Sequence, residues 1–170
     1  MAYDIKRMYS QAKGFQLAGE RCVEVREHPE QKWLPIQAIV CFSFACEIYL
    51  KAIYQYENPD SDRLKIHTLD DLFGMISDEH KDYIRNELSK DYRTEDIEKY
   101  IKQSSKVFED YRYVYESDSD EREHVGFVYS FSVALERLVG KLIWKTVHLM
   151  AGIEWDKDSD LLWESLPRET

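Results

Sequence analysis

The sequence predicts an all-α helical bundle of four long helices, with two short helices inserted between the second and the third. Apolar residues recur at steps of three and four over long stretches, which is the period of an amphipathic helix. The 170-residue chain holds only 6 Gly and 4 Pro, too few for the many turns of a β-sandwich or barrel. Its 44% hydrophobic content is enough for one buried core, which excludes a disordered chain.

The first two predicted helices differ in how much of their surface is apolar. Residues 3–27 carry apolar side chains on one face, so we expect an amphipathic helix that ends before Pro29. Residues 33–57 are apolar around nearly the whole circumference, which is typical of a helix in the middle of a bundle. We interpret this stretch as a core helix and not as a membrane span, because four residues interrupt it: Pro35, Gln37, Glu47 and Lys51.

Capping residues mark the starts of the next three helices. Thr68 and Ser77 begin two short helices, the second of which runs to about Leu88. Thr94 begins the third long helix, whose apolar stripe continues to about Glu116.

The last long helix is expected over residues 127–150, after an acidic run at 117–123 that we interpret as an exposed loop. Residues 1–150 are therefore treated as one helical domain, and residues 151–170 as a C-terminal tail. We expect the tail to dock on the bundle or on a partner through four apolar residues: Trp155, Leu161, Leu162 and Trp163.

Charge and cysteine content restrict the partners and the compartment. The 33 acidic and 23 basic side chains give a net charge of −10, which disfavours non-specific coating of nucleic acid but leaves room for a local basic cleft. Three cysteines in apolar helical patterns (Cys22, Cys41 and Cys46) indicate buried thiols in a reducing compartment. The N-terminus does not look like a signal peptide, so we expect a cytoplasmic protein.

The sequence holds no motif of the mainstream metalloenzymes, nucleoside triphosphatases or hydrolases. It has no His-Glu-x-x-His, no paired cysteines, no glycine-rich phosphate loop and no nucleophile elbow. We therefore expect no metal and no cofactor.

Ser43, Glu47 and Lys51 follow one another at four-residue spacing in the apolar second helix, so they lie on one stripe. Two interpretations stay open. In one, Glu47 and Lys51 form an intrahelical ion pair at the edge of the bundle. In the other, Glu47 reaches across the bundle to Arg112 or to the helix start at His67, because a poorly solvated carboxylate needs a partner. We interpret His67 itself as a residue that fixes a loop against a helix start.

Arg112 lies one step from an apolar stripe and beside Tyr113 and Tyr115. A planar guanidinium among tyrosine rings suits recognition of a phosphate or a base. The alternative is a structural arginine that pairs with Glu47 or Glu116 and packs its stem on the rings.

On three stretches, in order, the chain resembles HEPN-domain proteins. They are 42–53 (FSFACEIYLKAI), 67–73 (HTLDDLF) and 108–116 (FEDYRYVYE). The resemblance implies an all-α bundle that commonly forms a two-fold dimer, found in bacterial toxin–antitoxin, phage-defence and CRISPR-associated systems. Many members of this family are metal-independent ribonucleases.

The usual catalytic motif of the family is an Arg followed by a His after about four to six residues. The Arg stabilises phosphate charge and the His assists proton transfer from the 2′-hydroxyl. After Arg112 this sequence has Ser117, Asp118 and Ser119 where that His is expected, so the motif is incomplete.

Three functions follow from these observations. The first is a HEPN-like protein of a bacterial or phage conflict system that acts as a dimeric, RNA-related binding or regulatory module, with Arg112 facing the cleft. The second is a metal-independent endoribonuclease in which Arg112 acts with Glu116 or His67. The third is a structural protein-interaction domain whose Glu47–Arg112 contact holds helices together. The expected ligand-binding or cleft residues are Glu47, Lys51, Tyr113 and Tyr115.

The expected partners are a second copy of the chain, RNA or a nucleotide, and a cognate partner protein. We expect no membrane association.

Overall fold

The computed structural model describes residues 4–24, 35–62, 64–105, 122–152, 154 and 156, and the structural statements below concern these residues. They contain helices and connecting segments and no strand, so the predicted all-α class is confirmed. The helices are α1 (Ile5–Glu24), α2 (Pro35–Glu57), α3 (Leu69–Met75), α4 (Asp78–Leu88), α5 (Thr94–Ser104) and α7 (Arg122–Met150).

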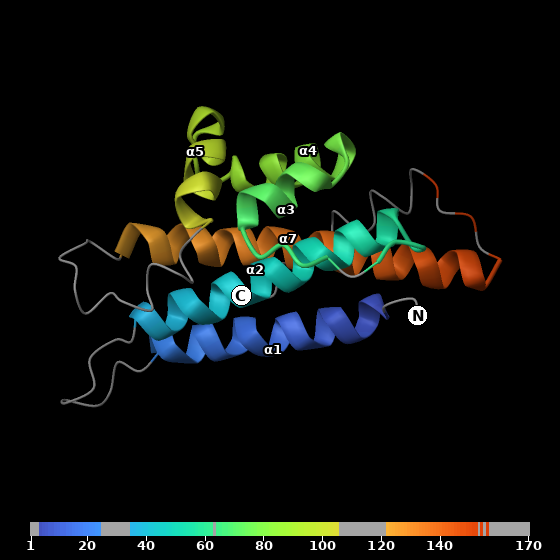
Figure 1. Cartoon of the computed structure of the whole chain (residues 1–170), viewed down its shortest axis with the longest axis horizontal. Coiled ribbons are helices and arrows are strands. Elements are labelled where there is room, and N and C mark those ends of the chain that lie inside the picture. The colour runs from blue at the N-terminus through green and yellow to red at the C-terminus, as the bar shows by residue number, and fades with distance from the viewer. Residues whose placement is uncertain are drawn as a thin grey trace.

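Three long helices form the body of the bundle. Helices α1, α2 and α7 run side by side, and α3, α4 and α5 cover α2 and α7 on the side away from α1 (Figure 1). Helix α2 packs on α1 along one side and on α7 along the other. It is therefore the central helix of the bundle, as the sequence predicts.

The burial of α2 explains its composition. Nine of its apolar side chains are at most 1% exposed: Ala38, Ile39, Phe42, Ala45, Cys46, Tyr49, Leu50, Ala52 and Ile53. The helical segment Ile36–Glu57 is long and apolar enough to cross a membrane, judged by length and composition alone. However, 56% of its apolar 18-residue stretch is buried inside the bundle. Burial against α1 and α7 accounts for that hydrophobicity, because a central helix is apolar all round.

Two helix boundaries differ from those predicted. Helix α5 ends at Ser104 and not near Glu116; residues 106–121 lie outside the described part of the chain. Ser105 follows as its C-cap and exchanges hydrogen bonds with Asp70 at the start of α3, so a tertiary contact accompanies this end. The apolar stripe alone gives no signal for such a contact.

Helix α7 begins at Arg122 and not near residue 127. The end of the predicted acidic loop, residues 122 and 123, is therefore helical. Arg and Glu have high helix propensity, so a lack of apolar residues does not end a helix. The described residues thus hold three long and three short helices, where four long and two short were predicted.

The cysteines are free, as predicted, but only one of them is fully buried. The Cys46 thiol donates to the Val128 carbonyl oxygen at 3.6 Å, and burial raises its pKa well above the ordinary value. Cys22 and Cys41 are half-buried, and burial together with the neighbouring Cys22 raises the pKa of Cys41.

A network of polar side chains joins the three long helices inside the bundle. Glu136 of α7 accepts a hydrogen bond from Tyr9 at 3.1 Å and pairs with Lys13 at 2.7 Å, both through Oε1. Its Oε2 accepts from Gln16 at 3.0 Å, and the Gln16 amide oxygen in turn accepts from the Tyr49 hydroxyl at 3.2 Å. Gln16 and Tyr49 are at most 1% exposed, so this network fixes the register of α1 on α2 and α7.

Gly19 of α1 lies directly against the ring of Phe42 of α2. A Cβ atom on Gly19 would lie 2.6 Å from Cε1 of the Phe42 ring, which is itself buried. Any larger residue at this position requires the buried ring to shift, which a packed core resists.

We predict that Gly19→Ala destabilises the protein although alanine is the better helix former. Overpacking against a buried ring lowers the free energy of unfolding by about 1–3 kcal/mol. The matched control is Gly14→Ala in the same helix, where no atom lies within 4 Å of the new Cβ. This control is expected to raise the free energy of unfolding by up to about 1 kcal/mol. Urea denaturation measures both, and equal effects of the two changes contradict the packing argument.

We predict that Tyr49→Phe weakens the loss of stability at alkaline pH. Burial, with the Glu136 charge adding to it, raises the Tyr49 pKa well above the ordinary tyrosine value. Above pH about 10 the unfolded chain therefore gives up a proton that the folded chain keeps, and the free energy of unfolding falls by up to about 1.4 kcal/mol per pH unit. Urea denaturation at increasing pH should show a shallower fall for Tyr49→Phe, and parallel curves for the two proteins would refute this.

Candidate functional site

A groove of about 430 Å³ lies between α1, α2 and the segment that joins α2 to α3. Its volume is in the usual range of small-ligand sites. Helix periodicity explains its walls, because residues three or four apart share a face. Helix α1 contributes Met8, Gln11 and Phe15; α2 contributes Phe44, Glu47, Ile48, Lys51, Tyr54 and Gln55; and the connecting segment contributes Leu64.

Glu47 is the charged centre of this groove wall. Its Oε1 atom accepts from Lys51 Nζ at 2.7 Å and lies 2.9 Å from His67 Nδ1. The Glu47 and Lys51 side chains are 17% and 16% exposed, whereas His67 is 69% exposed. Both sequence-based interpretations of Glu47 therefore hold in part: it pairs within α2 and also reaches the helix start at His67. The third residue of the stripe, Ser43, is buried and does not line the groove.

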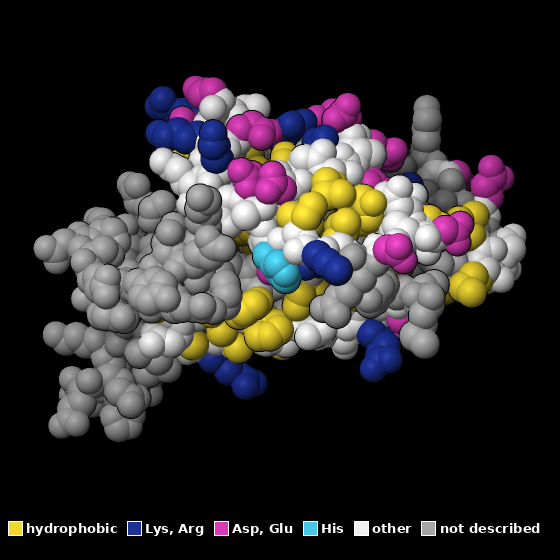
Figure 2. All heavy atoms as spheres, viewed as in Figure 1, with side chains coloured by type: hydrophobic (Ala, Val, Ile, Leu, Met, Phe, Trp, Pro, Cys, Tyr) yellow, Lys and Arg dark blue, Asp and Glu magenta, His cyan; other side chains and the backbone are white. Residues whose placement is uncertain are grey.

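The turn after α2 brings His67 to Glu47. The Gln55 amide donates to the carbonyl oxygens of Asn58 and Pro59, each at 3.1 Å, and the Ser61 hydroxyl donates to the Asn58 carbonyl at 2.7 Å. After this turn, the connecting segment leads to the start of α3. On the face shown in Figure 2, a histidine ring and a basic side chain lie above a hydrophobic patch.

Helix α3 begins at Leu69 with Thr68 as the N-cap residue, as predicted. The Thr68 hydroxyl makes no capping hydrogen bond to the backbone and donates to the Asp71 carboxylate instead. The capping pattern therefore predicted the helix start correctly, although the Thr68 hydroxyl bonds to a side chain and not to a backbone N–H as a usual N-cap does.

A second carboxylate–histidine pair lies near the end of α2 and was not singled out from the sequence. Glu57 accepts from the Ser77 backbone N–H at 2.9 Å and contacts His80 Nδ1 at 2.6 Å. The Glu57 and His80 side chains are 14% and 11% exposed, so this pair ties α4 to α2. By contrast, the Glu47–His67 pair presents its imidazole to solvent.

The groove also contains aromatic side chains, Phe15 and Phe44, for which the apolar pattern of the sequence predicts only a place in the core. The rings of Phe15 and Phe44 stack with centroids 5.2 Å apart and an interplanar angle of 28°. Both are half-buried and both line the groove. Apolar periodicity does not separate a core position from a groove wall, so the sequence offered no signal for this role.

The remaining predicted site residues lie outside the described part of the chain. Arg112, Tyr113, Tyr115 and Glu116 belong to the segment 106–121. The proposed contact of Glu47 with Arg112, and the pairing of Arg112 with Glu116, stay predictions. Most of the tail after residue 150 is outside the described residues as well.

The site offers hydrogen bonding, ion pairing and a proton-exchanging imidazole. A carboxylate on Nδ1 fixes the orientation of His67 and leaves the other ring nitrogen available for proton transfer. Among the described residues, no three or more His, Cys, Asp or Glu side chains form a group that could hold a metal ion.

No family model matches the chain, and neither a curated protein nor a solved structure matches it.

We predict that the Glu47–Lys51 pair couples more strongly than an exposed ion pair on the same protein. A double-mutant cycle with Glu47→Gln and Lys51→Met is expected to give a coupling free energy of about 1 kcal/mol, because both groups are largely shielded from water. The control cycle uses Asp78→Asn and Lys81→Met, where the lysine side chain is 16% exposed, like that of Lys51, but the Asp78 carboxylate is 92% exposed, so this cycle should give below about 0.5 kcal/mol. Equal coupling in the two urea-denaturation cycles contradicts the prediction.

Proposed function

We propose that this chain is a HEPN-like helical domain of a bacterial or phage conflict system, and that it acts as a dimeric, RNA-related binding or regulatory module. One observation carries the proposal: Glu47 and Lys51, from the first stretch of the resemblance, line one groove, and His67, from the second stretch, contacts the Glu47 carboxylate. An all-α bundle is also the fold that the resemblance implies.

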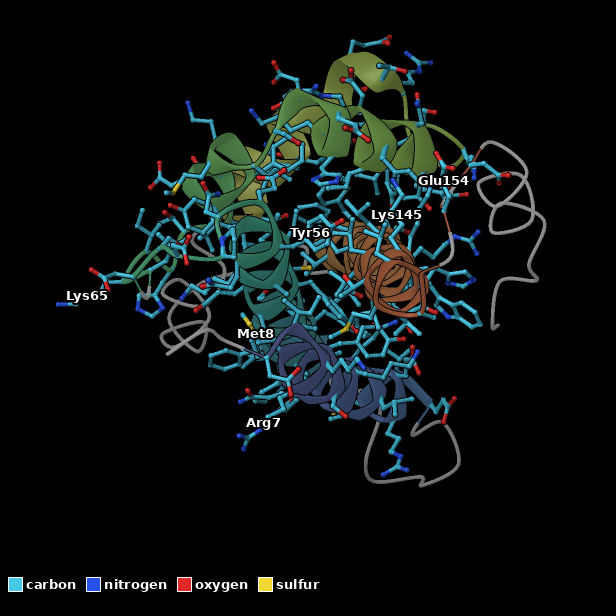
Figure 3. All side chains as sticks on the ribbon, turned by 90° about the vertical axis from the view of Figure 1, so that its right-hand side faces the viewer. Arg7, Met8, Tyr56, Lys65, Lys145 and Glu154 are labelled. Atoms are coloured by element: carbon cyan, nitrogen blue, oxygen red, sulfur yellow. The ribbon has the colours of Figure 1, made fainter. Side chains whose placement is uncertain are left out.

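Basic side chains near the groove support an anionic ligand in spite of the net charge of −10. Lys51 lines the groove itself. Arg7 on α1 and Lys65 in the segment before α3 are exposed and extend to the same side of the molecule (Figure 3). Local cations of this kind attract phosphate groups without non-specific coating of the whole protein.

A metal-independent ribonuclease is the second candidate, and the His67 geometry favours it specifically. The imidazole is 69% exposed and its Nδ1 lies 2.9 Å from the Glu47 carboxylate. This arrangement suits a general base that takes the proton of a ribose 2′-hydroxyl, with Arg112 as the group that stabilises phosphate charge.

We predict that the wild-type protein binds RNA from a mixed total RNA pool in EDTA, and that Arg112→Ala weakens this binding by about tenfold or more. Arg93→Ala, at an exposed arginine before α5, is the matched control and should bind like wild type. Filter binding measures affinity, a gel detects cleavage, circular dichroism confirms folding, and light scattering gives the oligomeric state.

Each outcome of this experiment separates the candidates. Cleavage in EDTA that stops in a folded His67→Ala variant identifies the ribonuclease, with His148→Ala as the histidine control. No RNA bound by wild type contradicts both RNA-related candidates. A drop of several degrees in the melting temperature of Arg112→Ala, without any RNA binding by wild type, identifies the structural domain.

A further inference from the structure

The last two turns of α7 hold most of the large apolar side chains that are exposed in the described part of the chain. Trp144 is 53% exposed, Val147 41% and Met150 83%. Steps of three residues place these side chains on one side of the helix, and we call them the α7 stripe. Leu149 is 63% exposed as well, but it lies on the opposite side of α7 from Val147.

The α7 stripe continues the side of α7 that packs on α1. Glu136 contacts three side chains of α1. Val147 follows Glu136 after about three full helical turns, so both residues face the same side. Ile143, between them on this side, packs against the core. In Figure 1, the end of α7 extends past the N-terminal end of α1. The stripe is therefore a core-facing side of α7 that runs on beyond the point where α1 begins.

The α7 stripe can pair with itself about a two-fold axis. If Val147 lies on the axis of an antiparallel helix pair, Trp144 of one copy lies opposite Met150 of the other. A small residue at the centre allows two helices to approach closely, and the flexible methionine adapts to the indole ring. The Trp144 ring contacts the His148 ring with centroids 5.4 Å apart, which restricts its orientation. Such self-complementarity is what an isologous dimer requires.

The exposed area of the stripe is of the size that a second copy would cover. At about 200 Å² for each large side chain, the exposed fractions leave roughly 350 Å² of apolar surface on each copy. The largest apolar patch on a monomer has about this size and often has a function. Two stripes together would bury roughly 700 Å², out of the ~1,000 Å² at which specific interfaces begin. The stripes would thus form the greater part of a small interface, which predicts a dimer of micromolar affinity.

We propose that a second copy of the chain packs on the α7 stripe, in an antiparallel pair of α7 ends with Val147 on the two-fold axis. The second copy's α7 end then takes the place that α1 has further along the bundle. This inference rests on the dimeric form named in the proposed function and identifies the surface through which the two copies pair.

The first test is sedimentation velocity of the full chain over a range of micromolar concentrations. Wild type should dimerise, and Val147→Glu should weaken the dimer by about tenfold or more, because it buries two like charges at the centre of the interface. Leu149→Glu is the matched control: it adds the same charge on the opposite side of the helix and should dimerise like wild type. Both positions are exposed, and circular dichroism confirms that both variants fold.

Disulfide cross-linking tests the position of the axis directly. Val147→Cys under mild oxidation should give a covalent dimer on a non-reducing gel, because the axis brings this position next to its own copy. Leu149→Cys should link no more than wild type, which measures the background from the three native cysteines.

A monomeric wild type, or equal effects of the two glutamate variants on the dimer, overturns the inference. With a monomeric wild type, residues 153–170 of the same chain or a different protein are left as the cover of the stripe. RNA binding, measured on the same samples, separates the two proposals. If a dimer that Val147→Glu leaves intact binds total RNA, the inference fails and the proposed function stands. If a dimer that depends on Val147 binds no RNA, the inference stands and the RNA-related function fails. A wild type that neither dimerises nor binds RNA contradicts both.

Discussion

The Glu136 carboxylate fixes how the three long helices of this bundle pack. A carboxylate inside a helical core is costly unless it is paired and fully hydrogen-bonded, and here Tyr9, Lys13 and Gln16 of α1 all contact it. Gln16 extends the network to Tyr49 of α2, so one acidic group on α7 sets the register of both neighbours. In that register Gly19 meets Phe42, and the Met8–Phe15 face of α1 lies opposite the residues of α2 that form the groove.

The two carboxylate–histidine pairs of α2 show how burial separates a structural role from a functional one. Glu57 and His80 are both shielded, and Glu57 also accepts a backbone N–H at the start of α4, so this pair holds two helices together. Glu47 is equally shielded, but its histidine partner stands in solvent. Of these two pairs, Glu47–His67 is the one that combines an anchored carboxylate with an accessible imidazole, an arrangement that suits proton transfer or ligand binding.

The sequence predicted α2 and its central position well, because a helix that is apolar all round has to be buried on all sides. The sequence also limited the expected partners of Glu47 to a few residues, since a poorly solvated carboxylate needs a partner. It did not decide between those partners: the approach of His67 depends on the turn that Gln55 holds through Asn58 and Pro59. The end of α5 was not predicted, because the Ser105–Asp70 contact beside it joins residues that are far apart in the chain.

The groove could not be predicted either, because the sequence pattern of its wall residues is that of core residues. Phe15 and Phe44 have the spacing of buried residues, and only the position of the returning segment around Leu64 leaves them beside an open volume. Under the proposed function, the chain's acidity then gives base contacts a large share of the recognition. A net charge of −10 and a few local cations release few counterions from RNA, so affinity has to come largely from stacking of bases on aromatic rings. The Phe15–Phe44 pair, which lines the groove beside Glu47, is a described aromatic surface of this kind.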